Sequence, residues 1–269
     1  MFYIVGSTGI VSKILQKIIK KKNYILISSK KKDSSIYSKI FNNKKINEKW
    51  INNIEKNDTI IFLSNLGNIS FYNKKKKIVR NFHSNITHNF FNKLNRKTKI
   101  IFFSSDMVFL GKKNYIYSDN SKQLPKNNYG KSKSIIEKII RKKFKNHLIL
   151  RLSKIYSLNR NDKSFINNII SQKKNFLFFD QIVHYLNIRD LKNILKIIIN
   201  RNDLKGSYNV PGKICCSRFH LLNQLIKKIN KNNIELIKIS IKSKKFIPIN
   251  LKLKTLLYKK INYKPKYIF

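Results

Sequence analysis

Short apolar runs alternate along the chain with longer segments in which apolar residues recur at helical spacing. Runs of strand length are found at 2–5, 24–28, 58–64, 99–105 and 147–153. Segments with helical periodicity are found at 9–22, 81–94, 129–144, 188–199 and 217–229. Continuous apolar strands that are separated by helices form parallel sheets buried on both faces. The pattern therefore predicts an α/β fold with a doubly wound parallel sheet.

Length and composition fit one large domain, or one domain with a small appendage. The chain has 269 residues, of which 42% are hydrophobic and 12% aromatic, enough to build a core. No run approaches the ~18 consecutive apolar residues of a membrane-spanning helix, and the first residues lack the pattern of a secretory signal. Cys215 and Cys216 are adjacent and form no disulfide framework, and the five histidines form no cluster. We expect a cytoplasmic protein with no metal site and no membrane partner.

The formal net charge of +47 has two competing explanations. Such a charge predicts affinity for polyanions, nucleic acid among them. However, the chain contains no alanine and only 7 glycines, and its lysines are spread over all segments, as a bias toward A/T-rich codons would produce. A nucleic-acid surface should concentrate its charge on one face. We therefore favour the coding bias and do not expect nucleic acid as a partner.

A turn with two glycines follows the first predicted strand, in the sequence VGSTGIVS. Gly6 and Gly9 stand in this turn, and Ser12 occupies the position where a third glycine is often found. Glycine is needed where the backbone approaches a diphosphate, and the next helix offers N–H groups at its first turn. An ordinary turn would also tolerate two glycines. Their place directly after strand one favours dinucleotide binding.

The end of the second predicted strand indicates which dinucleotide is bound. An acidic residue there would accept hydrogen bonds from the ribose 2′-hydroxyl and repel a 2′-phosphate. Ser28, Ser29 and Lys30 stand there instead, and no carboxylate occurs before Asp33. These residues predict NADPH as the cofactor, with NADH as the alternative. The general excess of lysine is the competing explanation.

Two Tyr-x-x-x-Lys pairs occur in the chain, Tyr72–Lys76 and Tyr129–Lys133. This spacing places two side chains on one face of a helix, but in a lysine-rich chain it also arises by chance. Tyr129–Lys133 lies at the start of a predicted helix and follows a strand that ends in two serines. Tyr72–Lys76 lacks that context, and we interpret it as a chance, solvated pair.

The second pair has a clear use beside the strand-end residues Ser104, Ser105 and Asp106, which lie where open α/β sheets bind ligands. A phenol is a poor acid at neutral pH, with a reference pKa of about 10, and a nearby ammonium lowers that pKa. Tyr129, aided by Lys133, could then protonate a carbonyl oxygen that a serine hydroxyl holds in place.

The ordered set of Gly-x-x-Gly, strand-end serine and Tyr-x-x-x-Lys resembles the extended short-chain dehydrogenase/reductases. Among them, the chain looks most like the dTDP-4-dehydrorhamnose reductase group, and the resemblance covers nearly its whole length. It is carried by segments in the expected order: 104–138, 148–156, 179–195 (with Asp180, Gln181 and Asp190) and 206–212. Asn85 also stands where related enzymes carry an asparagine.

The resemblance implies a Rossmann-type fold and a catalytic trio of Ser105, Tyr129 and Lys133. It implies a cofactor lined by Gly6, Ser7, Thr8, Gly9, Ile10, Leu63, Ser64 and Asn65, together with Tyr129 and Lys133. The substrate is expected to contact Ser104, Ser105, Asp106 and Met107. We expect a dinucleotide-binding domain at 1–150, and a mixed region at 151–269 that completes the sheet and forms a small substrate-binding part.

The implied activity is NADPH-dependent reduction of a 4-keto-6-deoxy nucleotide-sugar, in dTDP-rhamnose and surface polysaccharide biosynthesis. Several positions depart from the group: Ser12 replaces a glycine, residues 63–67 replace an alanine-rich stretch, and Ser153 and Lys154 replace a more aromatic pattern. An epimerase or dehydratase of the same superfamily is the nearest alternative, although a dehydratase should carry two carboxylates after the serine. A non-catalytic NAD(P)- or RNA-binding protein on this fold is a further alternative. A homodimer stays open.

Overall fold

The computed structural model of the chain describes residues 1–28, 36–37, 49–67, 69–82, 87–159, 165–228 and 233–268. The strands are β1 (Phe2–Val5), β2 (Tyr24–Ser28), β3 (Ile36–Tyr37), β4 (Thr59–Phe62), β5 (Lys99–Ser105), β6 (Ile116–Tyr117), β7 (His147–Leu152), β8 (Lys154–Tyr156), β9 (Lys174–Phe178), β10 (Ile182–Asn187), β11 (Gly206–Val210), β12 (Ile214–Cys216), β13 (Glu235–Ile239) and β14 (Asn250–Leu253).

The α-helices are α1 (Ile10–Ile18), α2 (Lys49–Asn52), α3 (Ile69–Lys74), α4 (Lys76–Asn81), α5 (His88–Lys93), α6 (Asn128–Lys143), α7 (Phe165–Ile170), α8 (Ile188–Ile199), α9 (Arg218–Lys228) and α10 (Leu257–Lys260). Short 3-10 helices are η1 (Lys21–Asn23), η3 (Asp106–Val108) and η4 (Ile241–Ser243). The five predicted strands are confirmed. Helices are found in each segment with helical periodicity, some of them shorter than predicted.

The chain forms two compact units. The first unit comprises residues 1–104, 127–150 and 201–207, and the second comprises 105–126, 151–200 and 208–269. The chain thus passes between the units more than once. The division at residue 150, expected from the sequence, stays a prediction.

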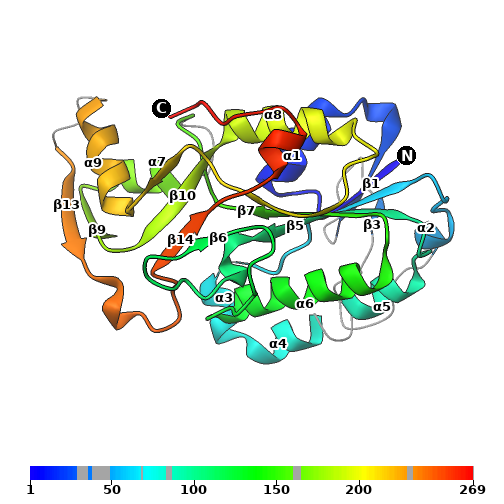
Figure 1. Cartoon of the computed structure of the whole chain (residues 1–269), viewed down its shortest axis with the longest axis horizontal. Coiled ribbons are helices and arrows are strands. Elements are labelled where there is room, and N and C mark those ends of the chain that lie inside the picture. Colours follow the sequence, from blue (N-terminus) through cyan, green and yellow to red (C-terminus); the bar gives the residue numbers. More distant parts are fainter. Residues whose placement is uncertain are drawn as a thin grey trace. The chain divides into compact units, whose positions relative to one another are not determined.

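Among the described residues, the largest sheet has seven strands in the order β11-β7-β5-β4-β1-β2-β3 (Figure 1). β1 pairs in parallel with β2 on one side and with β4 on the other, so that Val5 lies between Ile27 and Phe62. β2 and β3, and β4 and β5, are also parallel pairs. The strand order therefore reverses between β1 and β4, which confirms the predicted doubly wound Rossmann-type sheet. Such sheets bind ligands beyond the carboxyl ends of the strands at this reversal.

Helices cover both faces of the sheet in the first unit. Figure 1 shows α1 on one side of the sheet and α5 and α6 on the other. The core is rich in aromatic residues: Phe62 of β4 stacks on Phe90 with ring centroids 5.6 Å apart, and Phe91 lies edge-on to Phe144, the C-cap residue of α6. Its buried members are Tyr3, Val5, Ile27, Trp50, Ile51, Ile60, Phe62, Phe90, Phe91, Leu94, Ile100, Phe102, Ile136, Ile140, Phe144 and Ile149. The core thus holds α6 against the strands whose ends form the site.

The second unit contains a smaller sheet around β10. The strand order is β12-β10-β14-β6, and β8 also pairs with β10. A separate pair joins β13 and β9 in parallel. The core of this unit is formed by Val108, Phe109, Tyr117, Tyr156, Ile166, Leu177, Val183, Tyr185, Leu221, Leu222, Leu225, Leu251 and Leu253.

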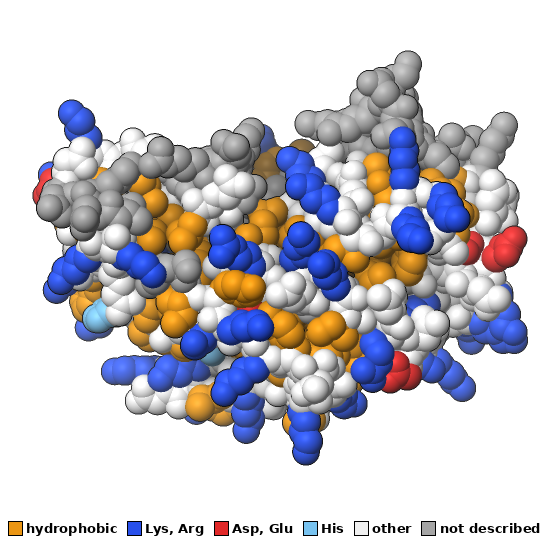
Figure 2. Space-filling model, turned by 90° about the horizontal axis from the view of Figure 1, so that it is seen from above, with side chains coloured by type: hydrophobic (Ala, Val, Ile, Leu, Met, Phe, Trp, Pro, Cys, Tyr) orange, Lys and Arg blue, Asp and Glu red, His pale blue; other side chains and the backbone are white. Residues whose placement is uncertain are grey.

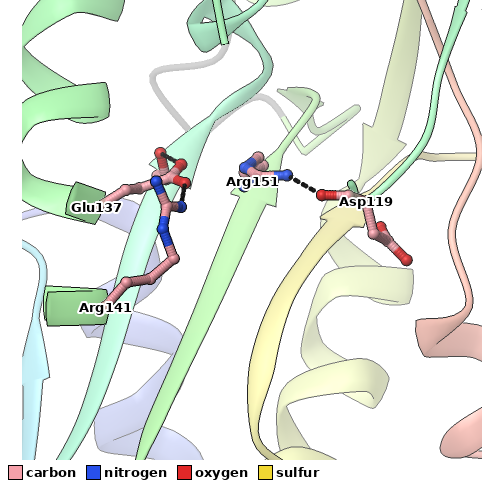
Figure 3. A network of polar contacts seen from close by, with 5 residues as sticks. Asp119, Glu137, Arg141 and Arg151 are labelled. Carbon is pink, nitrogen blue, oxygen red and sulfur yellow. Dashed lines mark hydrogen bonds and ion pairs between the residues drawn. The ribbon is translucent and has the colours of Figure 1, made fainter. Parts of the chain in front are cut away.

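Buried carboxylates fix loops and the C-terminal segment of the second unit. Asp119 accepts hydrogen bonds from the Asn209 and Leu256 amides at 2.7 and 2.8 Å, and its carbonyl oxygen accepts one from Arg151, drawn in Figure 3. Asp190 of α8, which is fully buried, accepts a hydrogen bond from the Tyr263 hydroxyl at 2.6 Å. A buried charge needs such partners, because an unpaired one is costly. These aspartates therefore serve the fold of this unit.

Candidate functional site

The glycine turn lies at the carboxyl end of β1 and leads directly into α1. Gly6 has a φ of +101°, a left-handed conformation that glycine adopts without the penalty of a side chain. Gly9 is the N-cap of α1, and a Cβ added to it would meet nothing within 4 Å. The first N–H groups of a helix have no acceptor within the helix, so this end offers donors to an anion. Ser12, in place of the third glycine, is buried and accepts a hydrogen bond from Gln16 at 3.0 Å.

The structure brings the segment after β4 against this turn. A Cβ at Gly6 would lie 2.9 Å from the amide nitrogen of Ser64, which leaves no room for a side chain. Leu63 continues the sheet, because its amide donates to the Val5 carbonyl at 2.8 Å. Residues 6–10 and 63–65, which the resemblance assigned to the cofactor, therefore lie side by side at the strand-order reversal.

These residues fit a bound dinucleotide. The Ser7 hydroxyl oxygen is buried and has no hydrogen-bond partner among the described residues, an arrangement that usually calls for a further ligand. The positive φ of Gly6 and the open space at Gly9 allow a diphosphate to approach the backbone closely. Ser7 to Ile10 and the N-terminus of α1 are therefore the groups that would hold it.

Part of the predicted cofactor site falls outside the described residues. Ser29 and Lys30 are not described, and of Ser28 only the backbone is, as the last residue of β2. Asn85 also lies outside the described ranges. The 2′-phosphate site at residues 28–30 therefore stays a prediction that rests on the sequence alone.

Tyr129 and Lys133 lie in the first turns of α6. Asn127 caps this helix by accepting a hydrogen bond from the Gly130 amide at 2.8 Å. The Lys133 ammonium lies 5.8 Å from the centre of the Tyr129 ring and donates to the carbonyl of Phe103, in β5, at 3.1 Å. The Tyr-x-x-x-Lys spacing therefore does place both side chains together. An ammonium held beside a phenol favours its deprotonated form.

A buried glutamate lies one helical turn beyond this lysine. Glu137 has no exposed surface and accepts hydrogen bonds from Ser104 at 2.6 Å and from Arg141 at 2.7 Å (Figure 3). Burial lowers the pKa of Lys133 to about 8, while the charge of Glu137 acts in the opposite direction. Glu137 therefore helps to keep Lys133 protonated near neutral pH. The sequence analysis missed Glu137, because its spacing of four residues from Lys133 does not distinguish a buried carboxylate from a surface one.

Replacing Glu137 by Gln is expected to shift the alkaline limb of the pH–rate profile to lower pH. The carboxylate favours the Lys133 ammonium, so its loss lowers the Lys133 pKa below the present value of about 8. As the pH rises, the ammonium is then lost earlier and turnover falls earlier. The measurement is kcat as a function of pH.

Glutamine has nearly the same shape as glutamate and keeps an oxygen that accepts from Ser104. The variant therefore removes the negative charge while it largely keeps the packing. Glu235→Gln is the matched control, because that carboxylate is exposed and pairs with Lys174 at 3.5 Å. An alkaline limb in Glu137→Gln that coincides with the wild type would contradict the role given to this carboxylate.

Ser105 and Asp106 belong to the second unit. Ser105 ends β5 and caps η3; its hydroxyl donates to Asp106 at 3.0 Å and accepts from the Met107 amide at 3.3 Å. Burial raises the pKa of Asp106 to about 6, against the Ser105 hydrogen bond and the charge of Lys154. The hydroxyl of Ser105 thus has a fixed orientation. The catalytic role of Ser105 and the predicted substrate contacts of residues 104–107 stay predictions.

Tyr72 and Lys76 were interpreted as a chance pair of solvated side chains, and for Tyr72 this interpretation is wrong, because its side chain is buried. Tyr72 is 1% exposed, and its ring meets the Tyr129 ring edge-on at 5.2 Å. Lys76 belongs to the next helix, α4, and is exposed. Tyr72 and Lys76 therefore lie on different helices, and their spacing of four residues does not place them on one helix face. The misleading feature was the lysine run, which concealed an amphipathic helix with Tyr72 on its buried side.

The charged surface is dispersed where it can be seen. On the face drawn in Figure 2, Lys and Arg side chains lie scattered among hydrophobic and uncharged ones. Among the described residues, no helix has the length and apolar character needed to cross a membrane. The expected absence of a nucleic-acid partner stays a prediction.

The reversed strand order, the glycine turn after β1 and the Tyr-x-x-x-Lys helix agree with the class of extended short-chain dehydrogenase/reductases, to which the family match below assigns the chain. The chain belongs to the family described as the RmlD substrate binding domain, whose model matches residues 1–250. None of the curated protein sequences matches this chain.

Several solved structures share the fold. The dTDP-4-dehydrorhamnose reductase from Bacillus anthracis, in complex with NADP, has a TM-score of 0.81 at 19% identity over 98% of this chain and 93% of its own. The reductase of the same name from Yersinia enterocolitica has a TM-score of 0.80 at 19% identity over 98% and 93%. A UDP-glucuronic acid 4-epimerase mutant from Bacillus cereus, in complex with UDP-4-deoxy-4-fluoro-glucuronic acid and NAD, has a TM-score of 0.78 at 17% identity over 99% of this chain and 94% of its own. These likenesses confirm the predicted fold.

Proposed function

We propose that this protein is an NADPH-dependent reductase of a 4-keto-6-deoxy nucleotide-sugar, of the dTDP-4-dehydrorhamnose reductase type. The observation that carries the proposal is the buried Lys133 ammonium, 5.8 Å from the ring of Tyr129 on the same helix. The family match over residues 1–250 and the dTDP-4-dehydrorhamnose reductases among the similar structures support this substrate class.

A nicotinamide dinucleotide, when bound, would supply the hydride. Tyr129 would give its phenolic proton to the keto oxygen of the substrate, and Ser105 would hold that oxygen by a hydrogen bond. Lys133 would stabilise the phenolate that remains, because its ammonium lies 5.8 Å from the centre of this ring. The Phe103 carbonyl and Glu137 keep that ammonium in place.

The reaction is tested with purified protein, NADPH and dTDP-4-dehydrorhamnose. Consumption of NADPH together with formation of dTDP-rhamnose supports the proposal. An epimerase would instead convert a nucleotide-sugar without net consumption of the reduced cofactor, and a dehydratase would release water. Steeply salt-dependent RNA binding without NADPH binding would favour a non-catalytic binding protein. Epimerase activity, dehydratase activity, or RNA binding without NADPH binding would each contradict the reductase proposal.

Replacing Ser28 by Asp is expected to shift the cofactor preference from NADPH toward NADH. The new carboxylate would repel a 2′-phosphate and accept hydrogen bonds from a 2′-hydroxyl. The ratio of kcat/KM for the two cofactors should change by about tenfold or more, the equivalent of one charged hydrogen bond. Ser171→Asp, which adds the same charge at an exposed position of the second unit, is the control. An unchanged ratio in Ser28→Asp would count against the placement of the 2′-phosphate.

A further inference from the structure

Tyr72 connects two parts of the first unit that the proposed function uses. Its hydroxyl donates to the Asn65 side chain at 2.5 Å and accepts a hydrogen bond from the Leu66 amide at 3.3 Å. The Asn65 side chain in turn donates to the Gly67 carbonyl at 2.8 Å. The segment after β4 is therefore tied to α3 through one phenol.

This phenol is in the state that these bonds require. Burial raises the pKa of Tyr72 to about 12, so the hydroxyl keeps its proton at neutral pH. A neutral phenol can donate to Asn65 and accept from Leu66 at the same time. Both bonds therefore persist over the pH range in which the enzyme would work.

The same side chain contacts the proposed catalytic tyrosine. The rings of Tyr72 and Tyr129 meet edge-on, with centroids 5.2 Å apart and planes at 86°. The carbonyl of Tyr72 also accepts a hydrogen bond from Asn128, the residue before Tyr129, at 3.4 Å. Aromatic rings prefer edge-to-face contacts of this kind, so the Tyr72 ring favours this placement of the Tyr129 ring.

We infer that Tyr72 is a positioning residue. Its hydroxyl holds the segment after β4, of which residues 63–65 are predicted to line the cofactor, and its ring holds the ring of Tyr129. The inference rests on the proposed function. It gives Tyr72 no step in the chemistry. Its two parts are separable, because the hydroxyl serves the segment after β4 and the ring serves Tyr129.

Two substitutions separate these parts. Tyr72→Phe removes the hydroxyl and keeps the ring, so NADPH should bind about tenfold more weakly while kcat changes by less than about threefold. Tyr72→Leu removes the ring as well, so kcat should fall by a further factor of about ten or more, because a small displacement of an acid from its substrate is costly. The measurements are the NADPH dissociation constant by fluorescence titration, kcat, and the melting temperature.

Tyr3→Phe is the matched control. Tyr3 is another buried tyrosine of the same unit, its hydroxyl donates to the Asn53 carbonyl at 3.1 Å, and its ring stacks on Trp50. This variant should lose stability without a change in NADPH affinity or kcat. If Tyr72→Phe does the same, Tyr72 is merely a core residue and the inference is overturned.

The wild type separates failure of this inference from failure of the proposed function. If the wild type binds NADPH but reduces a different substrate, the affinity and turnover of the Tyr72 variants still decide the inference on that substrate. If the wild type does not bind NADPH, the proposed function and the inference fall together. A loss of NADPH affinity in Tyr72→Phe that is absent in Tyr3→Phe supports the inference.

Discussion

Replacing Tyr129 by Phe should lower kcat by about three orders of magnitude while leaving NADPH affinity within about twofold of the wild type. The variant lacks the only atom that the proposal assigns to proton donation. It keeps the aromatic ring, whose centroid lies 5.2 Å from that of the Tyr72 ring, and it leaves Asn127, the N-cap residue of α6, unchanged. The loss therefore belongs to the chemical step. Single-turnover rates with NADPH, together with fluorescence titration of the cofactor, are the measurements.

A tyrosine outside the site gives the comparison for this experiment. Tyr115 is 44% exposed and lies in the second unit, so Tyr115→Phe should retain wild-type turnover. Residual activity of Tyr129→Phe close to that of Tyr115→Phe would remove Tyr129 from the role of acid. Equal losses of turnover and cofactor affinity in Tyr129→Phe would instead indicate that the phenol belongs to the binding site.

Among the described residues, local sequence patterns were enough to find five of the seven strands of the largest sheet, and the reason is physical. A strand buried on both faces is apolar over most of its length, and β4 and β5, which are buried throughout, carry polar residues only at their ends. The ends of helices were harder to predict. The periodic segment 9–22 continues through its lysines, whereas α1 ends at Ile18 and the chain turns extended at Ile19. Lysine has a good helix propensity, so lysines in the sequence do not indicate where a helix ends.

Residue spacing could place site residues only where these are close in sequence. Tyr129 and Lys133 share a helix, and Gly6 and Gly9 share a turn, so spacing together with the preceding predicted strand placed each pair. The approach of Ser64 to Gly6 depends on the pairing of β4 with β1, which no local pattern encodes. Long-range contacts of this kind are set by the whole sheet.

The burial of Tyr72 could also not be predicted from the local sequence. A run of lysines at 74–77 follows it in sequence and suggested a solvated position, while its neighbours in space include Asn65 and Tyr129. Glu137 is another such case, because a carboxylate in a basic helix reads as a surface charge until Ser104 is seen to donate to it. Burial of single polar residues is therefore the part of the site that the sequence conceals.

The largest effect on stability is expected in the second unit, at Gly212. A Cβ at this position would lie 1.8 Å from the carbonyl oxygen of Tyr185 and 2.6 Å from the Cα of Leu186, both in β10. The Gly212 backbone is also fixed, because its amide donates to Ser153 at 3.3 Å and its carbonyl lies 2.9 Å from the His184 ring nitrogen. The loop cannot withdraw from β10 without breaking these bonds.

Gly212→Ala should therefore lower the free energy of unfolding by about 3 kcal/mol or more, at the upper end of overpacking effects. The clash is with backbone, so no side-chain rotation relieves it. β10 would have to shift, and with it the pairing to β8, β12 and β14. Urea unfolding measures the change, with Gly9→Ala as the control, because its added methyl meets nothing within 4 Å. Equal midpoints for the two variants would show that this loop can move away from β10, and that close backbone packing does not explain the glycine at 212.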